Sequence, residues 1–60
     1  MSRYAEYYRA ESRAHQARAD AFKLDPTYDN HEETRQEFIG FYEDAAKNYE
    51  QMAESLEDFK

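Results

Sequence analysis

The chain contains no cysteine, and this absence excludes several kinds of stabilisation and chemistry. Without thiols there can be no disulfide, no cysteine nucleophile and no thiolate metal site. A folded chain of 60 residues hides only roughly 60% of the surface that its unfolded form exposes. Because so small a core is marginal and disulfides are excluded, we expect a second copy of the chain to supply the missing stability.

Long apolar segments are also missing. The sequence holds no run of even ten consecutive apolar residues, so we expect neither a membrane-spanning helix nor a signal peptide. Together with the lack of cysteine, this predicts a cytoplasmic protein without a membrane partner.

Glycine and proline occur once each, as Gly40 and Pro26. One glycine cannot build a glycine-rich phosphate loop, so nucleotide-binding classes that depend on one are excluded. Six tyrosines and four phenylalanines give the chain enough apolar surface to fold, which argues against disorder.

The longest regular pattern lies in residues 37–59, where apolar side chains recur at alternating spacings of three and four. One row consists of Phe38, Ala45, Met52 and Phe59, and the other of Tyr42, Tyr49 and Leu56. The residues Ile39, Ala46 and Ala53 run alongside and widen the stripe. A stripe of this width indicates a helix that packs against more than one neighbouring helix.

Residues 3–24 predict a first, alanine-rich helix with two apolar rows. The first row, here called the Tyr7 row, comprises Tyr7, Ala10, Ala14, Ala17, Ala21 and Leu24. The second, here called the Ala5 row, comprises Ala5, Tyr8, Ser12, His15, Ala19 and Phe22. We expect the small residues of the Tyr7 row to accommodate the bulky side chains of the second helix.

Residues 25–30 form the only cluster of turn residues, and Pro26 cannot continue the first helix. Either Asp29 or Asn30 is expected to cap the second helix. In the alternative register, Asp25 is the cap and Pro26 takes the first helical position. The apolar pattern keeps its phase across Gly40, which favours one continuous second helix over a break that would give three helices.

The predicted fold is therefore all-α, a single domain over residues 1–60 that forms an antiparallel helical hairpin. Its helices cover about 3–24 and 30–58, and two hairpins pair into a dimeric four-helix bundle. The longer second helix should overhang, leaving Leu56 and Phe59 without a partner in one chain, which also favours the dimer. The core and dimer residues are expected to be Tyr7, Ala14, Ala21, Phe38, Tyr42, Tyr49, Met52, Leu56 and Phe59.

The segment from Ala21 to Pro26, with Ala14 before it, resembles the end of a tetratricopeptide repeat. Arg18 stands where that repeat has a large apolar residue, and no second copy of the pattern follows. The chain is therefore not assigned to that family, and no binding residue is taken from it.

Catalytic and metal-binding patterns are not evident. His15 lies in the Ala5 row, where a partly buried, hydrogen-bonded histidine is expected, and His31 falls in the exposed start of the second helix. Inward positions of the second helix carry no acid, unlike those of carboxylate metal centres in helical bundles. We therefore expect a non-enzymatic protein without metal or cofactor.

The charge is distributed unevenly along the chain. Residues 1–24 carry five basic against three acidic side chains, whereas residues 25–60 carry three against eleven. Without a basic groove, direct nucleic-acid binding is not expected. The acids cluster opposite the apolar stripe of the second helix, as Glu43, Glu50, Glu54, Glu57 and Asp58.

This acidic cluster allows two interpretations. It is either a solvated face, neutralised in part by arginines of a first helix, or a partner-binding surface, since like charges four residues apart disfavour the helix. We take Glu43, Glu50, Glu54 and Asp58 as candidate partner-binding residues. Phe41 joins them, because it is either covered by the second copy or an exposed anchor for another protein.

The sequence thus predicts a small acidic protein-binding module that regulates or inhibits a host macromolecule, as phage-encoded accessory proteins do. One alternative is a nucleic-acid mimic of the anti-CRISPR or anti-restriction type, whose carboxylates take the place of phosphates. A further alternative is a structural assembly subunit.

Overall fold

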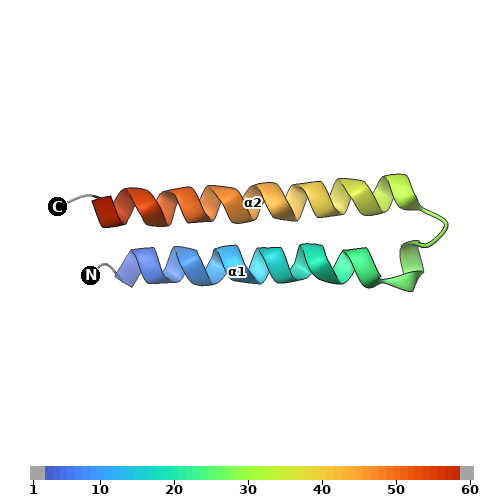
Figure 1. The fold of residues 1–60 in the computed structure, drawn as a ribbon, viewed down its shortest axis with the longest axis horizontal. Coiled ribbons are helices and arrows are strands. Elements are labelled where there is room, and N and C mark those ends of the chain that lie inside the picture. Colours follow the sequence, from blue (N-terminus) through green and yellow to red (C-terminus); the bar gives the residue numbers. More distant parts are fainter. Residues whose placement is uncertain (1–2, 59–60) are drawn as a thin grey trace.

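The computed structural model describes residues 3–58 and shows two long antiparallel helices joined by a short turn (Figure 1). Helix α1 spans Arg3–Leu24, the short 3₁₀ helix η1 spans Pro26–Tyr28, and helix α2 spans Glu32–Asp58. Both ends of the described chain lie at the same end of the hairpin. The predicted all-α hairpin is confirmed.

The turn begins with a capped 3₁₀ helix. The Asp25 carboxylate accepts a hydrogen bond from the backbone N–H of Thr27 at 2.9 Å, and Pro26 occupies the first position of η1. This hydrogen bond lowers the pKa of Asp25, because it favours the charged carboxylate. Asp25 therefore acts as a cap with Pro26 in the first helical position, as the alternative register predicts, but the helix that it caps is η1 and not α2.

Helix α2 begins at Glu32, two residues later than expected. The carbonyl of His31 accepts the first intrahelical bond, from the N–H of Arg35 at 2.9 Å. The expected cap at Asp29 or Asn30 is therefore wrong. Asp29 instead closes η1, since its N–H bonds to the Pro26 carbonyl, and the N–H of His31 bonds to the Tyr28 carbonyl.

Arg35 fastens the turn to α2. Its guanidinium donates to the carbonyl of Asp25 and to the carboxylate of Asp29, both at 2.8 Å, and it also pairs with Glu32. Only 12% of this side chain is exposed, so these bonds are shielded in part from water. The bonds fix the direction in which α2 leaves the turn.

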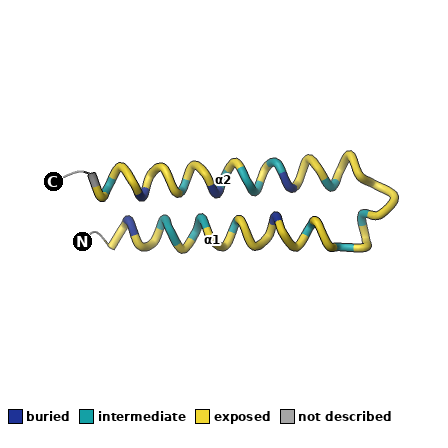
Figure 2. The backbone as a smooth tube through the Cα atoms, in the orientation of Figure 1, coloured by how far each residue is buried: buried dark blue, intermediate teal, exposed yellow. Residues whose placement is uncertain are grey.

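The helices approach along residues that repeat every seven positions and are mostly small, with Ile39 as the exception. The buried residues are Ala5 and Ala19 on α1 and Ile39, Ala46 and Ala53 on α2, on the facing sides of the two helices (Figure 2). Between them the Ser12 hydroxyl donates to the carbonyl of Ala46 at 2.8 Å, a bond that joins the two helices. Small side chains at the contact allow the two backbones to come close.

The row of α1 that packs against α2 is the Ala5 row. Tyr7, Ala14 and Ala21 of the Tyr7 row are exposed in the single chain, so the expectation that this row accommodates α2 within the hairpin is wrong. Only the Ala5 row places a ring after each small residue, at Tyr8, His15 and Phe22, and it therefore buries more apolar area.

The prediction that Leu56 has no partner in a single chain is also wrong. Leu56 is half-buried and lines the same hollow as Tyr8 of α1. At the next residue of each helix, Arg9 and Glu57 form a bidentate ion pair between the helices. At the turn α2 also extends past the end of α1, and there η1 packs against it through Tyr28 and Phe38 (Figure 1). Phe59 lies outside the described residues.

Gly40 lies inside the continuous helix α2, and a Cβ added to it meets no atom within 4 Å. Replacing Gly40 with alanine is expected to raise the free energy of unfolding by a few tenths to about 1 kcal/mol, since alanine restricts the unfolded chain and favours helix. Thermal or urea unfolding would measure the gain. A marked loss of stability would show that Gly40 makes a close contact that is not present in the single hairpin.

Candidate protein-binding surfaces

One side of the hairpin carries a continuous row of aromatic rings. Towards the open end, Tyr8 stacks on Tyr49 with 5.9 Å between ring centroids. In the middle, the ring of His15 lies 5.0 Å from that of Tyr49 and 5.9 Å from that of Tyr42. Rings from α1 and α2 therefore alternate along this side of the helix contact.

Near the turn the row continues through Phe22. Its ring stacks on Phe38 at 5.0 Å and on Tyr42 at 5.5 Å, and the ring of Tyr28 meets it edge-on at 5.6 Å. We call this side the aromatic face, and it comprises Tyr7, Tyr8, His15, Phe22, Tyr28, Phe38, Phe41, Tyr42, Tyr49, Met52 and Leu56.

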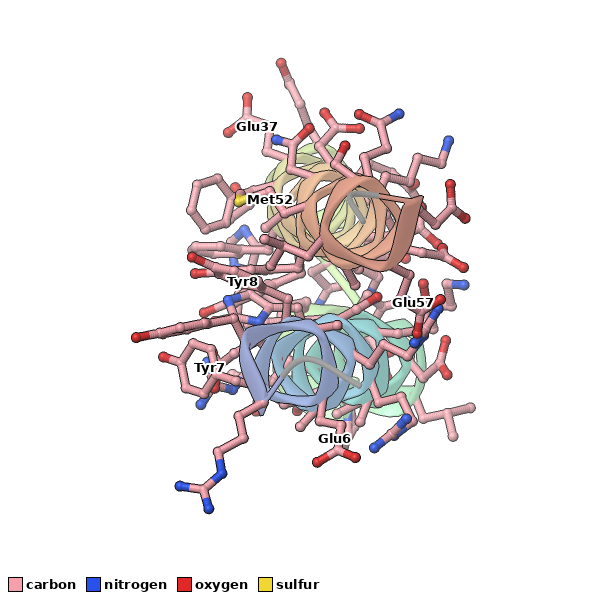
Figure 3. All side chains as sticks on the ribbon, turned by 90° about the vertical axis from the view of Figure 1, so that its left-hand side faces the viewer. Glu6, Tyr7, Tyr8, Glu37, Met52 and Glu57 are labelled. Carbon is pink, nitrogen blue, oxygen red and sulfur yellow. The ribbon has the colours of Figure 1, made fainter. Side chains whose placement is uncertain are left out.

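The aromatic face is only partly covered by its own chain. The exposed fractions are 58% for Tyr7, 39% for Phe38, 65% for Phe41 and 43% for Met52. Among the described residues no large side chain is fully buried. Seen along the helices, Tyr7, Tyr8 and Met52 project to one side and Glu57 to the other (Figure 3).

His15 is half-buried within this face, as its position in the Ala5 row predicts. Its Nδ1 lies 2.8 Å from the carbonyl oxygen of Glu11, one turn earlier in α1. This hydrogen bond and the two tyrosine rings hold the imidazole in place. Among residues 3–58 no group of three or more histidine and acidic side chains is arranged to hold a metal ion.

The opposite side of the hairpin is charged, and two ion pairs join the helices there. Lys23 donates to the carboxylate of Glu43 at 3.2 Å, and Arg9 pairs with Glu57. The hydrogen bond to Glu43 raises the pKa of Lys23, since it favours the charged ammonium. Glu43 and Glu57 are therefore neutralised by basic residues of α1, as one of the two interpretations of the acidic cluster expected, and these basic residues belong to the same chain.

Glu50 and Glu54 differ from these two acids. Both are exposed, and neither forms an ion pair with another residue of the described chain. Glu50 borders a shallow hollow between the helices that Arg13 and Lys47 also line. Asp58 is the last residue of α2, and its side chain lies outside the described part. Within the predicted acidic cluster, the acids without an ion pair among the described residues thus lie in the C-terminal half of α2.

Two structural roles were not predicted from the sequence. Ser12 joins the helices by its bond to Ala46, and Arg35 fastens the turn. A signal for the second was present, because Arg35 is the only basic residue between Lys23 and Lys47 and has acids on both sides.

No helix within residues 3–58 combines the length and the apolar character needed to cross a bilayer. Comparison of the chain with protein-family models, with curated proteins and with solved structures finds no match.

Proposed function

We propose that this protein is a non-enzymatic protein-binding module that assembles as a dimeric four-helix bundle and regulates or inhibits another macromolecule by covering part of its surface. The observation that supports this proposal is the partly exposed aromatic face. Aromatic rings arranged along one side of a helix pair are typical of surfaces that bind protein.

The exposed area of the hairpin supports association. A compact monomer of 7.2 kDa would expose about 4,100 Å², whereas this chain exposes 4862 Å². The excess of roughly 700 Å² is close to the area of about 800 Å² that each partner loses in a standard protein interface. The elongated shape, 49 × 14 × 9 Å, accounts for the excess. A second copy of the hairpin, packed as a layer on the aromatic face, would bury this excess area.

A concentration-dependent fold is expected from this assembly. The midpoint of thermal unfolding should rise with protein concentration, and sedimentation equilibrium should give twice the chain mass. Replacing Leu56 with alanine should weaken both folding and dimerisation, by about 2 kcal/mol, the low end for loss of a buried leucine, since Leu56 is half-buried in one chain. A stable monomer at micromolar concentration would remove the dimer from the proposal.

A second candidate function, mimicry of nucleic acid, is favoured by the unpaired acids of α2. Glu50 and Glu54 are exposed and free of ion pairs within the described residues, so their carboxylates are available to a basic groove. Like charges four residues apart destabilise a helix, and this cost is offset if the charges serve recognition. Partner binding distinguishes the two candidates, as argued in the Discussion.

A further inference from the structure

We infer that the second copy covers the aromatic face in an antiparallel arrangement, with a two-fold axis that crosses the middle of the hairpin. Helix α1 then packs on α1 of the second copy, and α2 on α2. This inference rests on the dimer of the proposed function and adds its geometry. It follows from the symmetry of charged and apolar residues about the middle of each helix.

On α1 the symmetric pair is Glu11 and Arg18. Both lie among the rings of the aromatic face, because residues three and four apart share one side of a helix. Glu11 lies between Tyr8 and His15 in this row, and the Arg18 guanidinium is 6.0 Å from the centre of the Tyr42 ring. Neither forms an ion pair with another residue of the described chain.

Antiparallel pairing brings these two charges together across the interface. Glu11 and Arg18 are seven residues apart, which corresponds to about 10 Å along the helix. If the axis passes midway, beside Ala14, then Glu11 of each copy faces Arg18 of the other. Two equivalent ion pairs form, as two-fold symmetry requires, and the small side chain of Ala14 allows close approach at the crossing.

Helix α2 has the same symmetry about Ala45. Phe38 and Met52 each lie seven residues from it, in the row that projects from the aromatic face, and both are about 40% exposed. Antiparallel pairing places Phe38 of each copy against Met52 of the other, a favourable contact between sulfur and ring. Ala45 then meets Ala45, so this crossing is also made by small side chains.

One axis can serve both helices because their midpoints lie at the same level of the hairpin. The ring of His15, next to the α1 midpoint, contacts both Tyr42 and Tyr49. Ala45 lies between these two tyrosines in the sequence. The contacts within one chain therefore set the two crossings side by side.

A parallel arrangement lacks this complementarity. With the axis along the helices, α1 would lie on α2 of the second copy. Glu11 and Arg18 would then face uncharged side chains of that helix, its tyrosines and alanines. Two charges would then lose water without gaining a partner, which is costly.

Charge exchange tests the pairing. Glu11→Arg and Arg18→Glu, made singly, should each raise the dimer dissociation constant about tenfold or more, because two ion pairs become two repulsions. The double exchange should restore it to about the wild-type value. Glu6→Arg with Arg13→Glu is the matched control, with the same charges and spacing. Glu6 points away from α2 (Figure 3), and this pair should leave the constant unchanged. Absence of rescue in the double exchange would overturn the inference.

Spin labels test the direction independently. Because the chain has no cysteine, Ala17→Cys and Leu24→Cys, both at exposed positions, each give one label per copy. In the antiparallel dimer the two labels should be offset along the bundle by about 8 Å at position 17 and about 28 Å at position 24. A parallel dimer would give the same separation at both positions, and that result would overturn the geometry.

The failures are distinguishable. A dimer with equal label separations contradicts only the antiparallel geometry and leaves the proposed function intact. A monomer in sedimentation contradicts the dimer and this inference together, while the aromatic face remains open to a different protein.

Discussion

Replacing Phe22 with alanine is expected to lower the free energy of unfolding by about 2–3 kcal/mol, somewhat less than the loss of a fully buried phenylalanine because Phe22 is half-buried. Its ring contacts those of Tyr28, Phe38 and Tyr42, so it connects α1, the turn and α2. A chain of this length has a total stability of only about 3–9 kcal/mol. The midpoint of thermal unfolding should therefore fall by about 10–20 °C.

Phe41→Ala is the matched control. Phe41 lies on the same side of the hairpin and is 65% exposed, and its ring meets that of Tyr42 edge-on. The same atoms are removed from a site where little area is buried, so the loss should be below about 1 kcal/mol at a concentration where the chain is monomeric. Circular dichroism during heating would measure both variants. Equal losses would contradict the view that Phe22 connects the parts of the hairpin.

Periodicity was sufficient to predict two helices and their antiparallel arrangement. The turn residues around Pro26 separated the helices, and the pattern across Gly40 predicted one continuous α2. These features depend on local backbone preferences and on spacing, which a sequence shows directly.

The choice between the two rows of α1 could not be predicted in the same way, because both rows have helical spacing. The choice depends on which side chains of α2 lie opposite the two rows. Ile39, Ala46 and Ala53 form a narrow strip that accepts small residues, and Tyr42 and Tyr49 beside it need rings to stack on. The Ala5 row supplies both features, and this complementarity appears only when the two helices are aligned.

The start of α2 and the surroundings of Leu56 were mispredicted for a related reason, whereas the bounds of α1 were predicted correctly. Helix lengths alone suggested an overhang at Leu56, but the position of the overhang depends on the turn. The cap at Asp25 and the bonds of Arg35 hold the turn beside the start of α2, so that part of the extra length of α2 lies beside η1. The acids around Arg35 indicate an ion pair, but its bond to the Asp25 carbonyl has no pattern of its own in a single sequence.

The acidic cluster was identified by its charge, but the difference between its paired and unpaired acids was not predicted. A helix pattern shows that Glu43, Glu50, Glu54 and Glu57 share one side of α2, yet it does not show which of them α1 neutralises. Lys23 and Arg9 reach Glu43 and Glu57 with long side chains that extend across the helix contact. The remaining acids of the cluster, Glu50 and Glu54, form no ion pair with another described residue.

Partner binding is expected to depend on these remaining acids if the protein imitates nucleic acid. The variant Glu50→Gln, Glu54→Gln, Asp58→Asn should then abolish binding to the partner, isolated from cell extracts and purified, and leave the hairpin folded. Affinity for the unaltered protein should fall steeply as salt rises, and nucleic acid should compete for the partner. Isothermal titration calorimetry at two salt concentrations would measure these effects.

The matched control removes three other acids of α2, in the variant Glu33→Gln, Glu37→Gln, Asp44→Asn. It has the same net charge but leaves Glu50 and Glu54 in place, so mimicry predicts that it retains most of the affinity.

If instead an apolar anchor makes the contact, both triple variants should bind normally. Phe41→Ala should then reduce binding by about 2 kcal/mol or more, since anchors in an interface carry most of its energy. Sedimentation of Phe41→Ala must first show an intact dimer, because loss of the second copy would also expose the aromatic face. If neither the acids nor Phe41 affect the binding of a partner, regulation through these surfaces is contradicted, and the chain is better described as a structural assembly subunit.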